Sequence, residues 1–221
     1  MSGKNHKMAE EKLSPIGKQT IIPSNETLNY YDQNATSFSE STLHVNFTET
    51  QQAFLNRLPS HAHILDFGCG AGRDTRYFLE QGYEVTAVDG SEALCKIASE
   101  YTGIPVKQMM FQELDETEKY DGIWACASIL HLKKTELPDV LMKMKKALKK
   151  QGVIYTSFKY GDHEDMRNGR YFTDFMEDLF TDFIKDISGL VIEKIWITGD
   201  VREGRGDERW LNIVLRKEDT P

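Results

Sequence analysis

Residues 66–72 read Asp-Phe-Gly-Cys-Gly-Ala-Gly and follow directly after the apolar pair Ile64 and Leu65. Three glycines separated by single residues leave the backbone without side-chain bulk. A ligand can therefore lie directly against main-chain N–H groups and the start of the next helix. The acid at the head of the loop favours a ligand with a positive or hydrogen-bond-donating part. No other stretch limits the chemistry of this chain as strongly.

A second segment indicates which kind of ligand to expect. The run from Glu84 to Asp89 has the pattern of a strand and ends in a carboxylate. A carboxylate at that strand end suits the hydroxyl pair of a ribose. The dinucleotide fingerprint requires its third glycine at position 73, where Arg73 stands instead. The two segments together predict an adenosine-type binding site in an open α/β sheet.

The glycine loop, Asp89 and the segments that follow resemble those of the class I S-adenosylmethionine-dependent methyltransferases, whose first motif runs acid-x-Gly-x-Gly-x-Gly. The resemblance covers roughly residues 29–217. Within the class, the chain is most similar to the small bacterial methyltransferases grouped with tellurite-resistance methyltransferases and ubiquinone/menaquinone-type methylases. This resemblance implies S-adenosyl-L-methionine as the cofactor. Another nucleotide, or a degenerate site, is the alternative.

Strands and helices alternate along the chain, which predicts an α/β fold with a parallel sheet and helices on both faces. The expected strands are residues 63–67, 84–89, 105–109, 122–127, 153–158, 190–198 and 210–216. The last two are joined by a connection too short for a helical crossover and should form an antiparallel hairpin. The resemblance implies a single-domain Rossmann-like methyltransferase fold with seven strands in the order 3-2-1-4-5-7-6, strand seven antiparallel.

Capping and turn residues place the helices. Helices are expected at 73–80, at 92–101 behind the cap Ser91, and from near Pro138 to a stop at Gln151–Gly152. Residues 160–165 have the pattern of a polar loop, and Phe172 to Phe180 that of an amphipathic helix. With one core to bury, the chain divides into a disordered N-terminal segment (1–24), an N-terminal helical lid region (25–60) and the methyltransferase catalytic domain (61–221).

The resemblance also implies which residues hold the cofactor. Asp66, Gly68 and Gly70 border its methionine portion, Gly72 permits close approach of a helix, and Asp89 accepts the ribose hydroxyls. Family members usually carry an acid facing the adenine at the end of strand three. Here Met110-Phe111-Gln112 stands there, so Gln112 or the Phe111 backbone is expected to substitute. The expected cofactor-binding residues are Tyr31, Asp66, Gly68, Cys69, Gly70, Gly72, Arg73, Asp89, Gly90, Ser91, Phe111, Gln112 and Ala127.

Two of these residues have an alternative role. Arg73 is suited to a two-pronged pair with the cofactor carboxylate, or else to an ion pair with Asp74, which is expected to be solvated. Tyr31, in the segment that resembles a lid, is expected to contact that carboxylate or to cover the methyl group. A packing role alone is the alternative for Tyr31.

Methyl transfer is an in-line displacement at a sulfonium carbon, so the protein mainly supplies alignment and a dry pocket. A base is needed only where the acceptor must lose a proton. His131, after the fourth expected strand, is the candidate base, with a structural role as the alternative. A group of cations could form a rim that binds an anionic acceptor. Arg170 is the preferred member of this rim, and its other candidates are Lys159, Arg202, Arg205 and Arg209. Solvation at the surface is the alternative for each of them.

Composition limits the partners. A net charge of −8 argues against sequence-independent grip on nucleic acid, and no apolar run approaches membrane-spanning length. Three cysteines give no disulfide framework, and Cys126 is expected to be a buried small hydrophobe. Metal binding by His61 and His63 is not expected. We expect a cytoplasmic enzyme, monomer or homodimer, with a small-molecule acceptor. The alternatives are a nucleic-acid methyltransferase, a non-catalytic cofactor-binding protein and a pyridine-nucleotide oxidoreductase.

Overall fold

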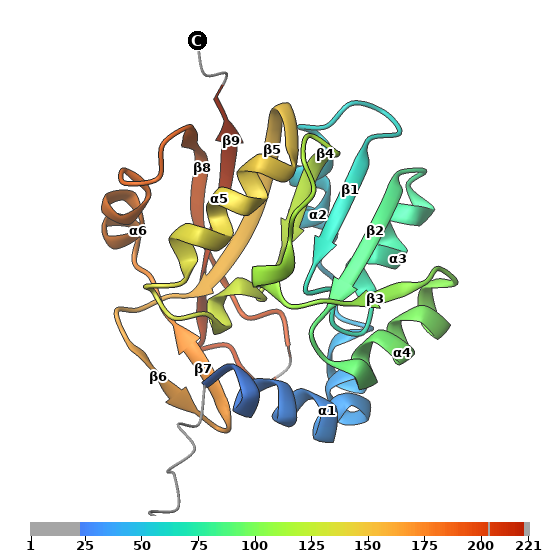
Figure 1. Ribbon diagram of the computed structural model, residues 1–221. Helices are drawn as coiled ribbons and strands as arrows, with labels where there is room; N and C mark the ends of the chain where they lie inside the picture. Colours follow the sequence, from blue (N-terminus) through green and yellow to red (C-terminus); the bar gives the residue numbers. More distant parts are fainter. Residues whose placement is uncertain (1–22, 203, 219–221) are drawn as a thin grey trace, which may run out of the picture.

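The computed structural model describes residues 23–202 and 204–218 of the 221-residue chain, and nearly all of the segment expected to be disordered lies outside them. Seven strands form one sheet in the order β3-β2-β1-β4-β5-β9-β8 (Figure 1). They are β1 (His63–Phe67), β2 (Glu84–Asp89), β3 (Val106–Gln108), β4 (Tyr120–Ala125), β5 (Leu148–Lys159), β8 (Leu190–Gly199) and β9 (Arg209–Lys217). Pairs among β1 to β5 are parallel, and β9 is antiparallel to both β5 and β8. The predicted fold and strand order are confirmed.

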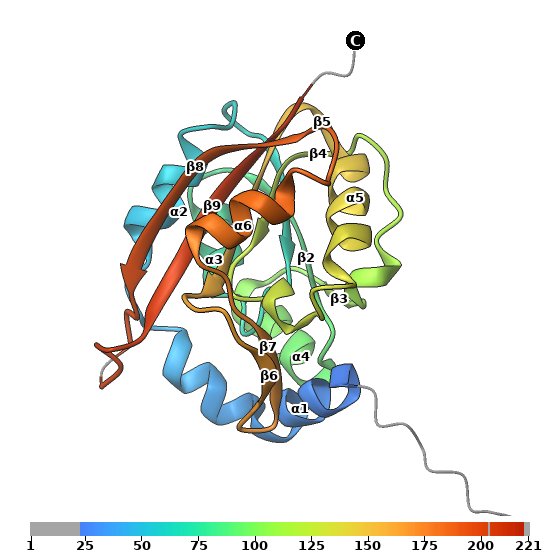
Figure 2. The same cartoon turned by 90° about the vertical axis from the view of Figure 1, so that its left-hand side faces the viewer.

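Helices cover both faces of the sheet, as Figures 1 and 2 show. They are α1 (Pro23–Thr42), α2 (Thr48–Leu55), α3 (Arg73–Glu80), α4 (Glu92–Thr102), α5 (Leu137–Ala147) and α6 (Glu177–Ile184), with short 3₁₀ turns η1 (Phe111–Glu113) and η2 (Ile129–His131). Helices α2 and α3 pack on one face, and α5 and α6 on the other.

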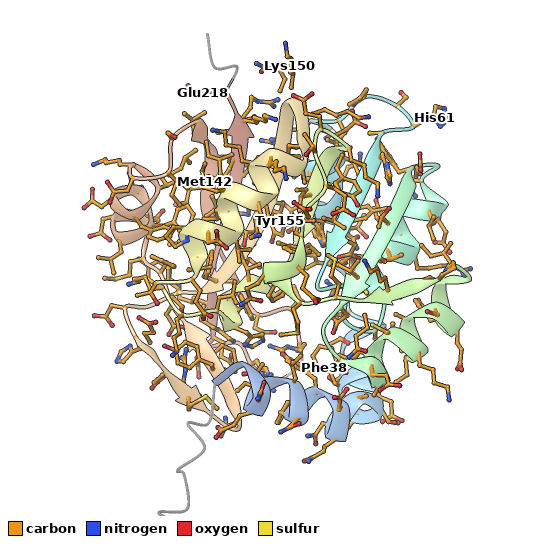
Figure 3. The ribbon with its side chains drawn as sticks, in the orientation of Figure 1. Phe38, His61, Met142, Lys150, Tyr155 and Glu218 are labelled. Carbon is orange, nitrogen blue, oxygen red and sulfur yellow. The ribbon has the colours of Figure 1, made fainter. Side chains whose placement is uncertain are left out.

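The sequence of β1 explains why both faces need cover. Successive side chains of a strand point to opposite faces, and four of its five residues are buried. Ile64 packs with α2 and α3, whereas Leu65 and Phe67 pack with the α5 and α6 side. A strand buried on both faces is typical of parallel sheets. Tyr155 of β5 is fully buried near the centre of the same sheet (Figure 3).

Helix α1 lies across the carboxyl ends of the parallel strands (Figure 1). Polar contacts join it to two other elements. Asp32 accepts hydrogen bonds from the Ser91 hydroxyl (2.6 Å) and the Ala93 N–H (3.2 Å) at the start of α4. Thr27 accepts one from the Tyr171 N–H at 2.9 Å. The helix is therefore positioned to cover whatever lies at that end of the sheet.

Two expected elements between β5 and α6 are wrong in part. Residues 160–163 form a loop as expected, but Glu164 and Asp165 belong to a separate two-stranded sheet, β6 (Glu164–Arg167) and β7 (Arg170–Thr173). Asn168 (φ 50°) and Gly169 (φ 77°) form its turn, and Asn-Gly with two positive φ angles is typical of tight hairpins. Because β6 is mostly exposed, it shows no apolar alternation. The amphipathic helix accordingly begins at Glu177, after Phe172 has been used in β7.

The expected stop at Gln151–Gly152 is also wrong. Helix α5 ends at Ala147 and β5 begins at Leu148. The pairing of β5 with β4 shifts register between Leu148 and Val153, and Gln151 has a φ of 59°. Residues 149–152 therefore form an irregularity inside the strand. Its Gln151–Gly152 pair is also typical of a helix end, which explains the wrong prediction.

Candidate functional site

A cavity of about 230 Å³ lies where the carboxyl ends of the parallel strands meet α1. It joins the glycine loop after β1 to the connection between β8 and β9. Most of the expected site residues line it: Tyr31, Gly68, Cys69, Gly70, Arg73, Asp89, Gly90, Phe111, Gln112, Ala127, His131 and Arg170. Three others, Asp66, Gly72 and Ser91, lie behind the wall instead. The fold thus brings residues from six separate segments to one cavity.

The glycine loop is fixed by the neighbouring strand. Gly68 and Cys69 both donate to the Val88 carbonyl, at 2.9 and 3.0 Å, and Gly70 donates to Asp89 Oδ2 at 2.8 Å. Gly68 has a φ of +84°, and a Cβ there would lie 2.5 Å from the Cβ of Ser128. The loop can approach its surroundings this closely only without a side chain.

Asp89 ends β2 and holds two backbone donors. Besides Gly70, the Ser91 N–H donates to its Oδ1 at 2.9 Å. Burial raises the pKa of Asp89 to about 6, although the backbone hydrogen bonds act against that rise. The carboxyl group therefore lines the cavity mainly as a carboxylate near neutral pH, with acceptor capacity left for a ligand.

Asp66 supports the loop from behind. It is buried, and the Thr75 hydroxyl of α3 donates to its Oδ2 at 2.5 Å. Burial, with the nearby charge of Asp74, raises the pKa of Asp66 to about 8. Gly72, with a φ of +90°, leaves room for α4, since a Cβ there would lie 2.7 Å from Thr102 Cγ2. Asp66 and Gly72 therefore hold the start of α3 against its neighbours and do not line the cavity.

Arg73 and Asp74 form a two-pronged ion pair, with Nε to Oδ1 at 2.8 Å and a second bond of 2.9 Å. The expectation of a solvated Asp74 is wrong, because Asp74 is buried and also accepts from Gln51 (2.7 Å) and Trp124 Nε1 (2.8 Å). Burial works against its charge, but the Arg73 guanidinium holds the pKa of Asp74 below its usual range. The Arg73 guanidinium also packs over Phe47, 4.8 Å from the ring centre.

Tyr31 and His131 meet over the cavity. His131 Nδ1 lies 2.6 Å from the Tyr171 carbonyl oxygen, which can only accept, so this nitrogen carries the proton. Nε2 is then the acceptor for the Tyr31 hydroxyl at 2.8 Å. Burial lowers the pKa of His131 to about 4 and raises that of Tyr31. Both groups are therefore neutral at pH 7, and they share one hydrogen bond.

Arg170 lines the same cavity from β7. Its guanidinium packs over three rings, at 4.5 Å from Tyr30, 5.1 Å from Phe172 and 5.8 Å from Tyr31. Its Nε is buried and has no hydrogen-bond partner within the described ranges. The guanidinium is thus held in place by aromatic contacts.

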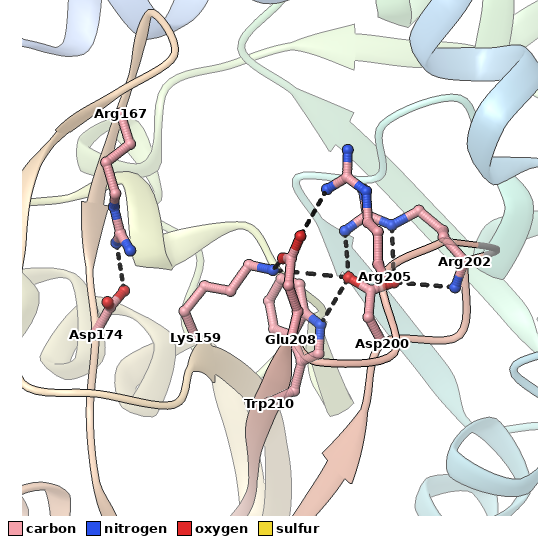
Figure 4. Close-up of polar contacts among 8 residues, drawn as sticks. All are labelled: Lys159, Arg167, Asp174, Asp200, Arg202, Arg205, Glu208 and Trp210. Atoms are coloured by element: carbon pink, nitrogen blue, oxygen red, sulfur yellow. Dashed lines mark hydrogen bonds and ion pairs between the residues drawn. The ribbon is translucent and has the colours of Figure 1, made fainter.

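A cluster of ion pairs closes the β8–β9 end of the cavity (Figure 4). The side chain of Asp200 is almost fully buried and pairs with Arg202 and Lys159, and Trp210 Nε1 donates to it at 3.1 Å. Burial works against its charge, but the hydrogen bonds from Arg202 hold the pKa of Asp200 well below its usual range. Glu208 also accepts from Lys159.

Several neighbours of the site were not predicted. Phe38 of α1 (labelled in Figure 3) packs near Gly70, 3.3 Å from the position of a Cβ there. Leu28 lies closer to Gly90, 2.7 Å from the position of a Cβ on that residue. The spacing of apolar residues along α1 could have indicated these contacts. The contact of Asp32 with Ser91 had no sequence signature, since the two are far apart along the chain.

The remaining polar residues have local partners. Cys126, expected to be buried, is half-buried and lines the cavity, and burial raises the pKa of its thiol to about 12. His61 contacts the Gly82 carbonyl, and His63 contacts the Thr86 hydroxyl. Across the described residues, no group of three or more His, Cys, Asp or Glu side chains could hold a metal ion. No helix in that part of the chain is long and apolar enough to cross a membrane.

Comparisons with known proteins agree with this geometry. A family model described as a methyltransferase domain matches residues 64–152. An uncharacterized methyltransferase of Staphylococcus carnosus is 28% identical over 66% of this chain and 73% of its own length. A ubiquinone biosynthesis O-methyltransferase of Rickettsia akari is 29% identical over 48% of this chain and 43% of its own length.

Among solved structures, the 1,6-didemethyltoxoflavin-N1-methyltransferase of Burkholderia thailandensis, with bound 1,6-didemethyltoxoflavin and S-adenosylhomocysteine, superposes with a TM-score of 0.70. It is 20% identical, over 96% of this chain and 94% of its own. The fold is therefore the Rossmann-like methyltransferase fold. Together with the glycine motif and the family match, it makes this protein a class I S-adenosylmethionine-dependent methyltransferase, with S-adenosyl-L-methionine as its cofactor.

Proposed function

We propose that this enzyme methylates a small molecule bound in the cavity beneath α1. The observation that carries the proposal is the continuity of that cavity. It runs from the glycine loop and Asp89 to a second end lined by Tyr31, His131 and Arg170. A cofactor at the first end and an acceptor at the second would share one continuous space.

The first end fits the cofactor. Gly68 and Gly70 form a stretch without side chains, suited to border the methionine portion, and Arg73 beside them offers a partner for its carboxylate. Asp89 retains acceptor capacity for the ribose hydroxyls. Phe111 and Gln112 line the cavity beyond Asp89, and we assign them to the adenine side.

When bound, the cofactor supplies an activated methyl group on a sulfonium sulfur. The protein's part is to align the acceptor, exclude water and receive a proton if the acceptor carries one. We assign the role of accepting this proton to Tyr31 and His131 acting together. The acceptor would hydrogen-bond to the Tyr31 oxygen and lose its proton to it, while the hydroxyl proton of Tyr31 passes to His131 Nε2. The Tyr171 carbonyl keeps His131 in the required tautomer.

Two observations support a small acceptor over a nucleic acid. Helix α1 covers the cavity, and hydrogen bonds between Asp32 and the start of α4 and between Thr27 and β7 hold it there. A net charge of −8 also disfavours binding to a phosphate backbone. The Burkholderia enzyme in the structural comparison is a 1,6-didemethyltoxoflavin-N1-methyltransferase with 1,6-didemethyltoxoflavin bound.

The test is transfer of label from methyl-labelled S-adenosylmethionine to a panel of small acids, phenols, thiols and amines, with S-adenosylhomocysteine measured as the second product. We expect product with at least one member of the panel and a strong loss of product in Asp89→Ala. Tight binding of S-adenosylhomocysteine without transfer to any acceptor would instead support the non-catalytic cofactor-binding alternative.

A further inference from the structure

Some of the cations around the cavity form ion pairs with carboxylates of the protein, and others do not. Lys159 pairs with Asp200 and Glu208, and Arg202 pairs with Asp200 (Figure 4). Arg205 lies 3.6 Å from Glu208. The sequence suggested that all three would form a cationic rim with Arg170. In the structure, each of the three lies in an ion pair with one or both of the two acids of the same cluster, Asp200 and Glu208.

Arg170 has no such partner. Within residues 23–202 and 204–218 it makes no ion pair with a carboxylate, and its buried Nε makes no hydrogen bond. The nearest arginine in sequence shows the contrast, because Arg167 of the same hairpin pairs with Asp174 at 2.5 Å. Arg170 is therefore a fixed positive charge at a cavity wall with donor capacity left over.

The surroundings of Arg170 are built to hold it without a carboxylate. The rings of Tyr30, Tyr31 and Phe172 contact its guanidinium on several sides. An arginine is weakly hydrated and stacks well on aromatic faces, so such a cage positions the fork of donors before a ligand arrives. A buried donor without a partner is costly, and a ligand oxygen would remove that cost.

We propose that Arg170 binds an anionic oxygen group of the methyl acceptor, so that the substrate is a small aromatic or otherwise apolar acid. This inference rests on the function proposed above. Apolar side chains, including Leu130, Phe172, Val201 and Trp210, also line the cavity, beside the ion-paired cluster of Lys159, Asp200 and Arg202. They suit the body of such a molecule, while Arg170 takes its charge. Tyr31, which contacts both Arg170 and His131, then lies beside the bound acid.

The competing assignment for Arg170 is the carboxylate of the cofactor. Arg73 directly follows the glycine loop and lines the same cavity. Its Nε and Nη2 are paired with Asp74, so Nη1 is the donor that it can offer to that group. Arg170 instead lies beside Tyr31 and Phe172, and Phe172 packs against His131 with ring centres 4.9 Å apart. The experiment below separates the two assignments.

The test uses the full-length protein saturated with S-adenosylhomocysteine. Aromatic monocarboxylates, each paired with its neutral carboxamide, are titrated into it by calorimetry. We expect at least one acid to bind about tenfold or more tightly than its amide, a preference typical of a charge-assisted hydrogen bond. In Arg170→Gln this preference should vanish, and in Arg170→Lys part of it should remain.

Arg209→Gln is the matched control. Arg209 also stacks on a tyrosine, 5.3 Å from the ring centre of Tyr160, but it does not line the cavity. This variant should keep the preference for acids.

Three results would overturn the inference: no acid preferred over its amide by the wild type, a preference that survives Arg170→Gln, or a tenfold loss of S-adenosylhomocysteine affinity in Arg170→Gln. The last would assign Arg170 to the cofactor. Failure of the wild type to bind S-adenosylhomocysteine would count against the proposed function instead.

Discussion

Replacing Gly68 by alanine tests the packing of the glycine loop. The new Cβ would lie 2.5 Å from Ser128 Cβ and 3.1 Å from Ser128 Oγ. Ser128 cannot easily move away, since it is buried and its hydroxyl donates to the Phe67 carbonyl at 2.7 Å. Alanine would also have to adopt a φ of +84°. The substitution therefore combines backbone strain with a steric clash.

The magnitude follows from these two contributions. A left-handed conformation costs about 1–2 kcal/mol for a residue with a Cβ. Overpacking of a well-filled site costs about 1–3 kcal/mol more. Gly68→Ala should therefore lower the free energy of unfolding by about 2–5 kcal/mol, a large part of the stability of an ordinary domain.

Gly103→Ala is the control for the strain alone. Gly103 caps α4 with a φ of +79°, and a Cβ there would meet nothing within 4 Å. Its cost should stay near about 1–2 kcal/mol. Urea unfolding gives both free energies, and calorimetry gives the affinity for S-adenosylhomocysteine, which should fall in Gly68→Ala only. Equal destabilisation of the two variants, or wild-type affinity in Gly68→Ala, would refute the packing argument.

Three further predictions concern the lid and the proposed proton path. Tyr31→Phe removes the hydroxyl that donates to His131 Nε2. Turnover of an acceptor that must lose a proton should therefore fall at least about tenfold. Unchanged turnover would show that Tyr31 takes no part in the proton transfer. The pKa of His131 is about 4 in the folded protein and 6.5 in the unfolded chain, so protonation favours the unfolded chain. As the pH falls from 6.5 to 4, the free energy of unfolding of the wild type, measured with urea, should decrease by about 3 kcal/mol relative to that of His131→Asn. The same pH dependence in both proteins would contradict the shift. Asp32→Ala deletes the acceptor for Ser91 and Ala93, so amides of α1 should exchange about tenfold faster, with unchanged protection as the contrary outcome.

The sequence predicted well those elements whose evidence is local. The bounds of β1, α3 and β2 match because apolar runs, glycines and a terminal acid mark them directly. The cap of α4 was equally clear, and Ser91 accepts from the Leu94 N–H at 3.1 Å. In each case the residues that make the structure lie within a few positions of one another.

Prediction failed where distant residues decide the outcome. The burial of Asp74 depends on donors from α2 and β4, Gln51 and Trp124, which sequence spacing does not bring together. The same holds for the ion pairs that neutralise Lys159. The β6–β7 hairpin is a different case, since Asn168-Gly169 was visible and only the missing apolar alternation concealed it.

A crystal structure of the complex with S-adenosylhomocysteine tests the central claim most directly, because it shows where each part of the cofactor lies. We predict both ribose hydroxyls within hydrogen-bond distance of the Asp89 carboxylate. The methionine portion should lie along Gly68 to Gly70, with the sulfur facing the end of the cavity that Tyr31 covers. A ribose bound away from Asp89, or a sulfur facing away from Tyr31, would contradict the account.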